Sequence, residues 1–161
     1  MGLLYYANGD HNASKWLHDR IETMVSMEAR EAFSDLDSLR RRLCRPRNGL
    51  TIAVLVAATG EELWDLLAMR DLLADLRLIL VLPDRSRETI KAGHRMAPRF
   101  LSYIDSGFEE VEAVLEQMLQ YNNNHTPETL AKLLGDVNPH KRGSMSRLKQ
   151  DEKIGFQLLR G

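Results

Sequence analysis

Short apolar runs alternate regularly with stretches of helical periodicity over most of this chain, and this alternation constrains the fold more than any other feature. The apolar runs, which we expect to be strands, occupy residues 3–7, 29–33, 50–58, 76–82 and 100–104. Each run is followed by apolar residues spaced three and four apart, as in amphipathic helices. Alternating strands and helices of this kind predict an α/β domain built around a parallel sheet.

Two of the runs identify the centre of that sheet. Residues 50–58 and 76–82 are almost continuously apolar and rich in β-branched or leucine side chains. Strands of parallel sheets have this composition when helices cover both of their faces. The run at 29–33 is less apolar and gives the weakest strand signal.

Polar residues with capping chemistry precede several of the expected helices. We expect Ser34 to cap the helix that continues through Leu36, Leu39 and Leu43. Thr59-Gly-Glu-Glu62 and Ser106-Gly-Phe-Glu109 have the form of capping boxes, in which the hydroxyl and the glutamate carboxylate each accept a backbone N–H. The first of these helices is expected to run on to Leu73.

The C-terminal part of the chain differs in character from the rest. We divide the sequence into an α/β domain over residues 1–121 and an extension over residues 122–161 that combines one helix, from Thr126 to about Leu134, with a partly flexible tail. The extension carries seven lysines and arginines against four acidic residues, although the whole chain has a net charge of −1. Near-neutral charge argues against nucleic acid as a partner.

Cysteine content and hydropathy indicate a cytoplasmic location. Cys44 is the single cysteine, so no disulfide can form within the chain, and a reducing compartment is expected. No apolar run approaches the roughly 18 residues of a membrane helix, and the N-terminal run is interrupted at Asn8-Gly9. We therefore expect no membrane association.

The pattern of five strands and five helices resembles the receiver domains of two-component signalling over residues 3–121. The part most similar to that family is Glu31-Ala-Phe-Ser-Asp-Leu-Asp-Ser-Leu-Arg40 followed by Leu50-Thr-Ile-Ala-Val-Leu-Val56. The resemblance implies a flavodoxin-like, doubly wound, five-stranded parallel sheet with strand order 2-1-3-4-5.

The residues that give receivers their chemistry are missing from this sequence. Receivers hold magnesium with an acidic pair after the first strand, and they place an aspartate phosphoacceptor, a Ser/Thr and a lysine at the ends of the third, fourth and fifth strands. Here the first loop offers only Asp10. The later strands end in Ala57-Ala58, Leu82-Pro83 and Ile104-Asp105. We therefore expect no aspartyl phosphorylation, no catalytic residue and no cofactor.

Ligands of doubly wound sheets bind where the strands end, and this sequence places polar side chains there. The candidate ligand or metal residues are Asp10, Thr59, Asp84 and Asp105. Carboxylates from several loops could hold a hard cation such as magnesium. The alternative interpretation is that these residues cap helices and form turns.

A second candidate is the densest basic cluster of the chain, which could bind an anion or an acidic partner. It consists of Arg40, Arg41, Arg42, Arg45 and Arg47. Neighbouring arginines can lower the pKa of a thiol such as that of Cys44, but a solvent-exposed helix end is the favoured interpretation of the cysteine and of the arginines. The five histidines lack the spacing of a metal site.

The sequence leads to two functional hypotheses. The first is a non-phosphorylated receiver-like signalling module that works through a protein partner or as a homodimer, with its fourth and fifth helices and its last strand as the contact face implied by the resemblance. The positive charge of the tail permits a second contact. The alternative is a small-molecule or metal-dependent enzyme that uses the carboxylates at the strand ends.

Overall fold

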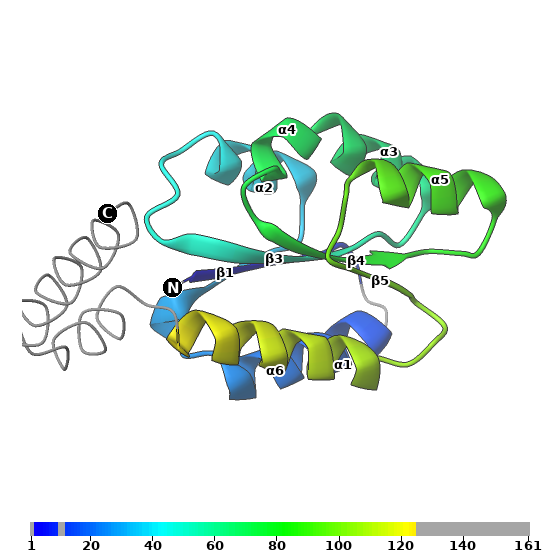
Figure 1. Cartoon of the computed structure of the whole chain (residues 1–161). Helices are drawn as coiled ribbons and strands as arrows, with labels where there is room; N and C mark the ends of the chain where they lie inside the picture. The colour runs from blue at the N-terminus through cyan, green and yellow to red at the C-terminus, as the bar shows by residue number, and fades with distance from the viewer. Residues whose placement is uncertain (1, 10–11, 125–161) are drawn as a thin grey trace, which may run out of the picture. The chain divides into compact units, whose positions relative to one another are not determined.

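A computed structural model describes residues 2–9 and 12–124 of the chain. The chain divides into two units, residues 1–119 and 120–161, and the layers described here belong to the first. They are a parallel sheet and two layers of helices, one on each face (Figure 1). The helix expected from Thr126 and the basic tail lie outside the described residues.

Five strands form the sheet in the order β2-β1-β3-β4-β5, and every neighbouring pair is parallel. This is the strand order that the sequence predicts. The strands are β1 (Gly2–Ala7), β2 (Arg30–Phe33), β3 (Leu50–Val56), β4 (Arg77–Leu82) and β5 (Phe100–Tyr103).

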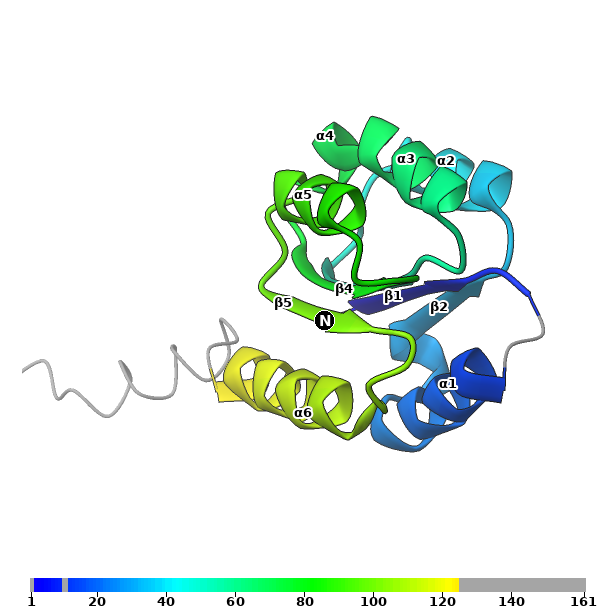
Figure 2. The same cartoon turned by 90° about the vertical axis from the view of Figure 1, so that its right-hand side faces the viewer.

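Helices connect the strands and cover both faces of the sheet (Figures 1 and 2). α2, α3, α4 and α5 lie on one face, and α1 and α6 lie on the other. The helices are α1 (Asn12–Met24), a 3-10 turn η1 (Met27–Ala29), α2 (Leu36–Leu43), α3 (Gly60–Ala68), α4 (Arg70–Leu73), α5 (Arg87–Arg95) and α6 (Glu109–Asn124).

Alternation along each strand divides the core into two clusters. Leu4 and Tyr6 of β1 point into the cluster beneath α2–α5, whereas Leu3 and Tyr5 point into the cluster above α1 and α6. All residues of β3 except Thr51 are buried. Each fully buried large apolar side chain stabilises the fold by about 1.5–3 kcal/mol relative to its exposed state, so β3 anchors both clusters.

The helix expected to continue to Leu73 is in fact two helices. Met69, with φ −96° and ψ 7°, separates α3 from α4. Its side chain is buried, and the apolar periodicity of Leu66 and Leu73 persists on either side of the break. The sequence pattern therefore predicts the buried face correctly but does not reveal the change of direction.

The predicted caps have mixed outcomes. Thr59 caps α3 as expected, because its Oγ1 accepts the Glu62 N–H at 3.2 Å. The cap of α2 is Asp35 rather than Ser34, since its carboxylate accepts the Ser38 N–H at 2.8 Å. The box expected at Ser106 does not form. Gly107 adopts a φ of +77°, and the Ser106 hydroxyl instead donates to the Tyr103 carbonyl at 3.1 Å.

None of the helices within the described ranges is long and apolar enough to cross a membrane.

Candidate functional site

The carboxyl ends of the strands face the viewer in Figure 2, and three of the predicted site residues lie at this edge. Thr59 follows β3, Asp84 follows β4 and Asp105 follows β5. The fourth, Asp10, lies outside the described residues.

Asp84 and Asp105 are held by groups of the protein itself. The Asp84 carboxylate accepts the Ser86 N–H at 2.8 Å, and this backbone hydrogen bond keeps the pKa of Asp84 below its ordinary value. Asp105 pairs with the Arg85 guanidinium at 3.3 Å. The same guanidinium lies 4.1 Å from the centre of the Tyr103 ring. A cation from the chain thus joins the loops after β4 and β5.

No group of three or more histidine, cysteine or carboxylate side chains capable of holding a metal occurs in the part of the chain that the structure describes. Asp105 pairs with Arg85, Asp84 accepts a backbone N–H of its own loop, and Thr59 serves as a helix cap. Each of these residues has a structural hydrogen bond or ion pair, as the turn-and-cap interpretation expects.

A buried pair that sequence reasoning missed lies between the ends of β1 and β3, where the strand order reverses. The Tyr6 hydroxyl donates to the Glu62 carboxylate, and the other oxygen of that carboxylate accepts the Ala58 N–H at 2.6 Å. Glu62 is 5% exposed. Burial first, and then the Glu62 hydrogen bond and charge, raise the pKa of Tyr6 well above its ordinary value.

This pair fills the position where doubly wound sheets usually admit a ligand. Both Glu62 oxygens are engaged by donors from the chain, and its backbone N–H is engaged by Thr59. The carboxylate therefore fastens the first turn of α3 to β1 and to the end of β3. A sequence signal existed only in part, because the capping-box pattern identifies Glu62 but not its distant partner Tyr6.

The arginine cluster lies at the opposite, amino edge of the sheet. Arg42 binds both carboxylate oxygens of Glu31 on β2. Arg47 binds the Asp75 carboxylate at 3.0 Å and the Leu72 carbonyl at 2.7 Å. Two of the five charges are therefore already paired with acidic side chains of the fold.

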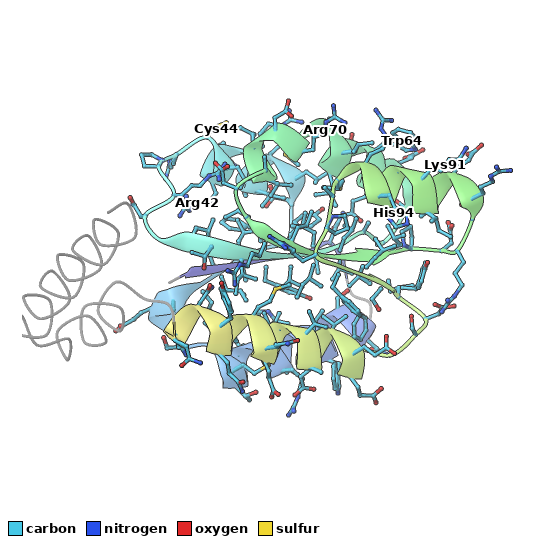
Figure 3. All side chains as sticks on the ribbon, in the orientation of Figure 1. Arg42, Cys44, Trp64, Arg70, Lys91 and His94 are labelled. Carbon is cyan, nitrogen blue, oxygen red and sulfur yellow. The ribbon has the colours of Figure 1, made fainter. Side chains whose placement is uncertain are left out.

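The other arginines and the cysteine surround the C-terminal end of α2. Arg41 bonds to the Asp37 carbonyl and to the Ser38 hydroxyl, each at 3.3 Å. Arg40, Arg45 and Cys44 are exposed. Figure 3 shows Arg42 and Cys44 at one end of the helical layer and Lys91 of α5 at the other. The cluster and the strand-end carboxylates are therefore separate surfaces.

A further surface, not identified from the sequence alone, follows the outer edge of β5. Half-buried apolar side chains from α5, from β5 with the residue after it, and from α6 line this edge, and we call them the β5 band. Its members are Ile90, Phe100, Leu101, Tyr103, Ile104, Val114 and Met118. Figure 1 shows β5 between α5 on one side and α6 on the other.

Opposite charges border the β5 band. α5 has the sequence RETIKAGHR, in which every charged side chain is exposed and bases outnumber acids. On the other border, α6 begins with Glu109, Glu110 and Glu112 and has no basic residue before Leu119. An apolar strip between a basic and an acidic helix is a surface with features of a protein interface.

No family model, curated protein or solved structure matches the chain. The protein has an α/β fold with a five-stranded parallel sheet in the order 2-1-3-4-5, which is compatible with a receiver-like architecture.

Proposed function

We propose that the chain is a receiver-like regulatory module of the cytoplasm that is not phosphorylated and acts by self-association through the β5 band. The observation that carries the proposal is the band itself, an apolar sheet edge bordered by a basic α5 and an acidic α6. A second copy of the same chain is the partner that matches this charge arrangement.

The strand ends support a role without phosphoryl transfer. In a receiver the acceptor aspartate stands at the end of the third strand, where this chain has Ala57, which is fully buried, and Ala58. The Glu62 carboxylate contacts this strand end, and it is buried and bonded to Tyr6 and Ala58. A buried carboxylate with both oxygens engaged is a poor nucleophile toward an incoming phosphoryl group.

Edge strands support the role of β5 in association. An uncovered sheet edge presents unpaired backbone groups and tends to pair or to be protected by charge. Leu101 and Tyr103 on one side of β5 and Phe100 and Ile104 on the other are only half-buried. A partner that covered them would remove apolar surface from water on both sides of the strand.

Charge selects the orientation of the two copies. A two-fold axis parallel to β5 sets α5 of one copy against α6 of the other, so that basic and acidic helices meet twice. An axis perpendicular to the sheet would instead set like helices against each other. The isologous contact with opposite charges is favoured, because like charges across an interface cost several kcal/mol.

The experiment uses two variants of the full chain with exposed substitutions. The first, Arg87→Glu with His94→Glu, makes the α5 border acidic. The second, Glu110→Arg with Glu116→Arg and Gln117→Arg, gives α6 a positive net charge. Light scattering coupled to size-exclusion chromatography measures the mass of each variant alone, of an equimolar mixture, and of the wild-type chain over a concentration series.

We expect the wild-type chain to form dimers and each variant alone to be monomeric. The mixture should form a heterodimer, because each acidic border then faces a basic one. A wild-type chain that stays monomeric at every concentration contradicts the proposal. So do variants that dimerise as well as the wild type, since the contact would then lie elsewhere.

A further inference from the structure

His94 lies on α5 at the border of the β5 band. Along this helix Arg87, Ile90 and His94 follow one another at spacings of three and four residues, so they form one row. Ile90 belongs to the band, and the row therefore faces the outer edge of β5. Figure 3 shows His94 on the side of α5 that faces the strands, whereas Lys91 points away from them. His94 is exposed to solvent, so its side chain is open to a partner at this edge.

The nearest charged neighbours of His94 along α5 are basic. Lys91 comes three residues before it and Arg95 directly after it. The elements that pack against α5 are α3, β4 and β5. The titratable or charged side chains of these elements and of the residue before β5 are Glu61, Glu62, Asp65, Arg77, Arg99 and Tyr103. No carboxylate forms an ion pair with His94 in the part of the chain that the structure describes.

Association through the β5 band sets α6 of a second copy opposite α5. α6 has no lysine or arginine, and its acidic side chains are Glu109, Glu110, Glu112 and Glu116. Of these, Glu112 is already paired with Arg20 of α1. Histidine changes its charge between pH 5 and pH 8, whereas arginine, lysine and glutamate keep theirs over that range. Among the side chains of α5 and α6, both of which are described in full, His94 is therefore the one whose charge responds to pH near neutrality.

We propose that protonation of His94 strengthens self-association through the β5 band, so that the dimer becomes tighter as the pH falls from 8 to 6. The acidic partner of His94 in this arrangement is α6 of a second copy, so the proposal rests on the proposed function. Lys91 and Arg95 oppose a further positive charge in the separated chain, and the partner's α6 offsets them in the dimer. Association then takes up protons, and linkage requires that protons and the second copy each favour the binding of the other.

The expected effect is moderate, because His94 is exposed and exposed ion pairs contribute little individually. A dimer with two-fold symmetry contains the contact twice. We expect the dissociation constant of the dimer to be about tenfold lower at pH 6 than at pH 8, a difference equivalent to about 1.4 kcal/mol. High salt should reduce this difference, since it screens charges at an exposed border.

Sedimentation analysis of the full chain at pH 6 and pH 8, at one ionic strength, measures the dissociation constant. His94→Gln removes the titrating group and should give one value at both pH values, close to that of the wild type at pH 8. His94→Lys fixes the positive charge and should dimerise at pH 8 about as tightly as the wild type at pH 6.

A matched control separates His94 from the other histidines. His18 lies on α1 and contacts Glu22 of the same helix at 3.5 Å, away from the β5 band. His18→Gln should keep the full pH dependence of the wild type. The remaining histidines, which lie outside the described residues, are His11, His125 and His140. Because they are unchanged in every variant, loss of the pH dependence in His94→Gln alone assigns the effect to His94.

The outcomes distinguish a failure of the pH response from a failure of the contact. A wild-type dimer with equal dissociation constants at the two pH values overturns the role of His94 and leaves the β5 band contact standing. A His94→Gln variant that keeps the tenfold difference, or a His94→Lys variant no tighter than the wild type at pH 8, overturns that role as well. A wild-type chain that stays monomeric at both pH values overturns the contact and the pH response together.

Discussion

The Tyr6 hydroxyl binds the Glu62 carboxylate and so joins the interior strand β1 to the first turn of α3. The two residues are 56 positions apart in the chain. Because Ala58 donates to the same carboxylate, three separate segments meet at one buried charge. Removing one partner of a buried charged group lowers the free energy of unfolding by more than the net contribution of the hydrogen bond, because the charge stays buried without its partner.

We predict that Tyr6→Phe lowers the free energy of unfolding by about 1–3 kcal/mol, since it leaves one Glu62 oxygen without its donor. Urea denaturation followed by circular dichroism measures the change. Tyr103→Phe, which keeps the ring beneath Arg85, is the control and should change stability by less than about 0.5 kcal/mol. An equally small effect at Tyr6 would mean that the pair contributes no net stability.

Two buried tyrosines predict a loss of stability at high pH. Burial raises the pKa of Tyr5, and burial followed by the Glu62 interaction raises the pKa of Tyr6, in both cases well above the ordinary value. A raised pKa in the folded state stabilises the fold below the unfolded value, near 10, and that stability is lost as the pH increases further.

The measurement follows phenolate absorbance and circular dichroism together from pH 8 upward. We expect the Tyr5 and Tyr6 phenolates to appear only as the fold is lost, and Tyr5→Phe should move the alkaline transition to higher pH. Ionisation of both tyrosines in a fully folded protein would contradict the prediction.

Two capping aspartates predict sensitivity to acid. Backbone N–H groups of Ser38 and Ser86 hold the pKa values of Asp35 and Asp84, respectively, below the ordinary value. A lowered pKa contributes stability above the unfolded value and loses it as the pH falls through the folded value. The double variant Asp35→Asn with Asp84→Asn should therefore lose less stability than the wild type between about pH 4 and pH 2. Identical slopes in urea titrations at those pH values would count against it.

Gly93 lies where α5 packs closely against the sheet. A methyl group at this position would lie 3.0 Å from Leu82 Cδ2 and 3.2 Å from Leu101 Cδ1. We expect Gly93→Ala to destabilise the fold by about 1 kcal/mol or more, although alanine is the better helix former. Gly60→Ala, where a methyl group meets nothing within 4 Å, should instead stabilise it. If both substitutions stabilise the protein, the side chains of Leu82 and Leu101 move aside at no cost, and the prediction is wrong.

α2 carries two arginines in different surroundings, which allows the value of an ion pair to be measured. Arg42 binds Glu31 through two nitrogens, whereas Arg40 is exposed. Arg42→Lys should cost about 0.5–1.5 kcal/mol, because lysine cannot form the two-pronged contact. Arg40→Lys should be close to neutral. Equal effects of the two changes in thermal denaturation would show that the ion pair is fully offset by solvation.

The fold could be predicted from local patterns because its central strands are covered on both faces. The runs at 50–58 and 76–82 need no tertiary information to be recognised as buried strands. The break at Met69 was missed because the same leucine face continues through it. The failed box at Ser106 shows that Gly107 favours a left-handed turn over a cap.

The candidate sites were predicted less completely, since they depend on residues that are distant in sequence. Asp84 and Asp105 were assigned to one edge correctly, but no pattern predicts that Arg85 binds Asp105. Tyr6 and Glu62 each look unremarkable alone. The β5 band likewise combines side chains of α5, β5 and α6, and no local sequence pattern predicts that these three segments lie together.

The interior position of β1 in the sheet has a consequence for synthesis on the ribosome. Leu3 pairs with Arg30 of β2 on one side and with Ile52 of β3 on the other. β1 leaves the exit tunnel before β3, so it cannot gain its second neighbour until β3 has also emerged. At ordinary elongation rates this delay lasts roughly 3–10 s. During that interval an apolar segment of the nascent chain is open to aggregation or to chaperone binding, because pairing with β2 covers only one edge of β1.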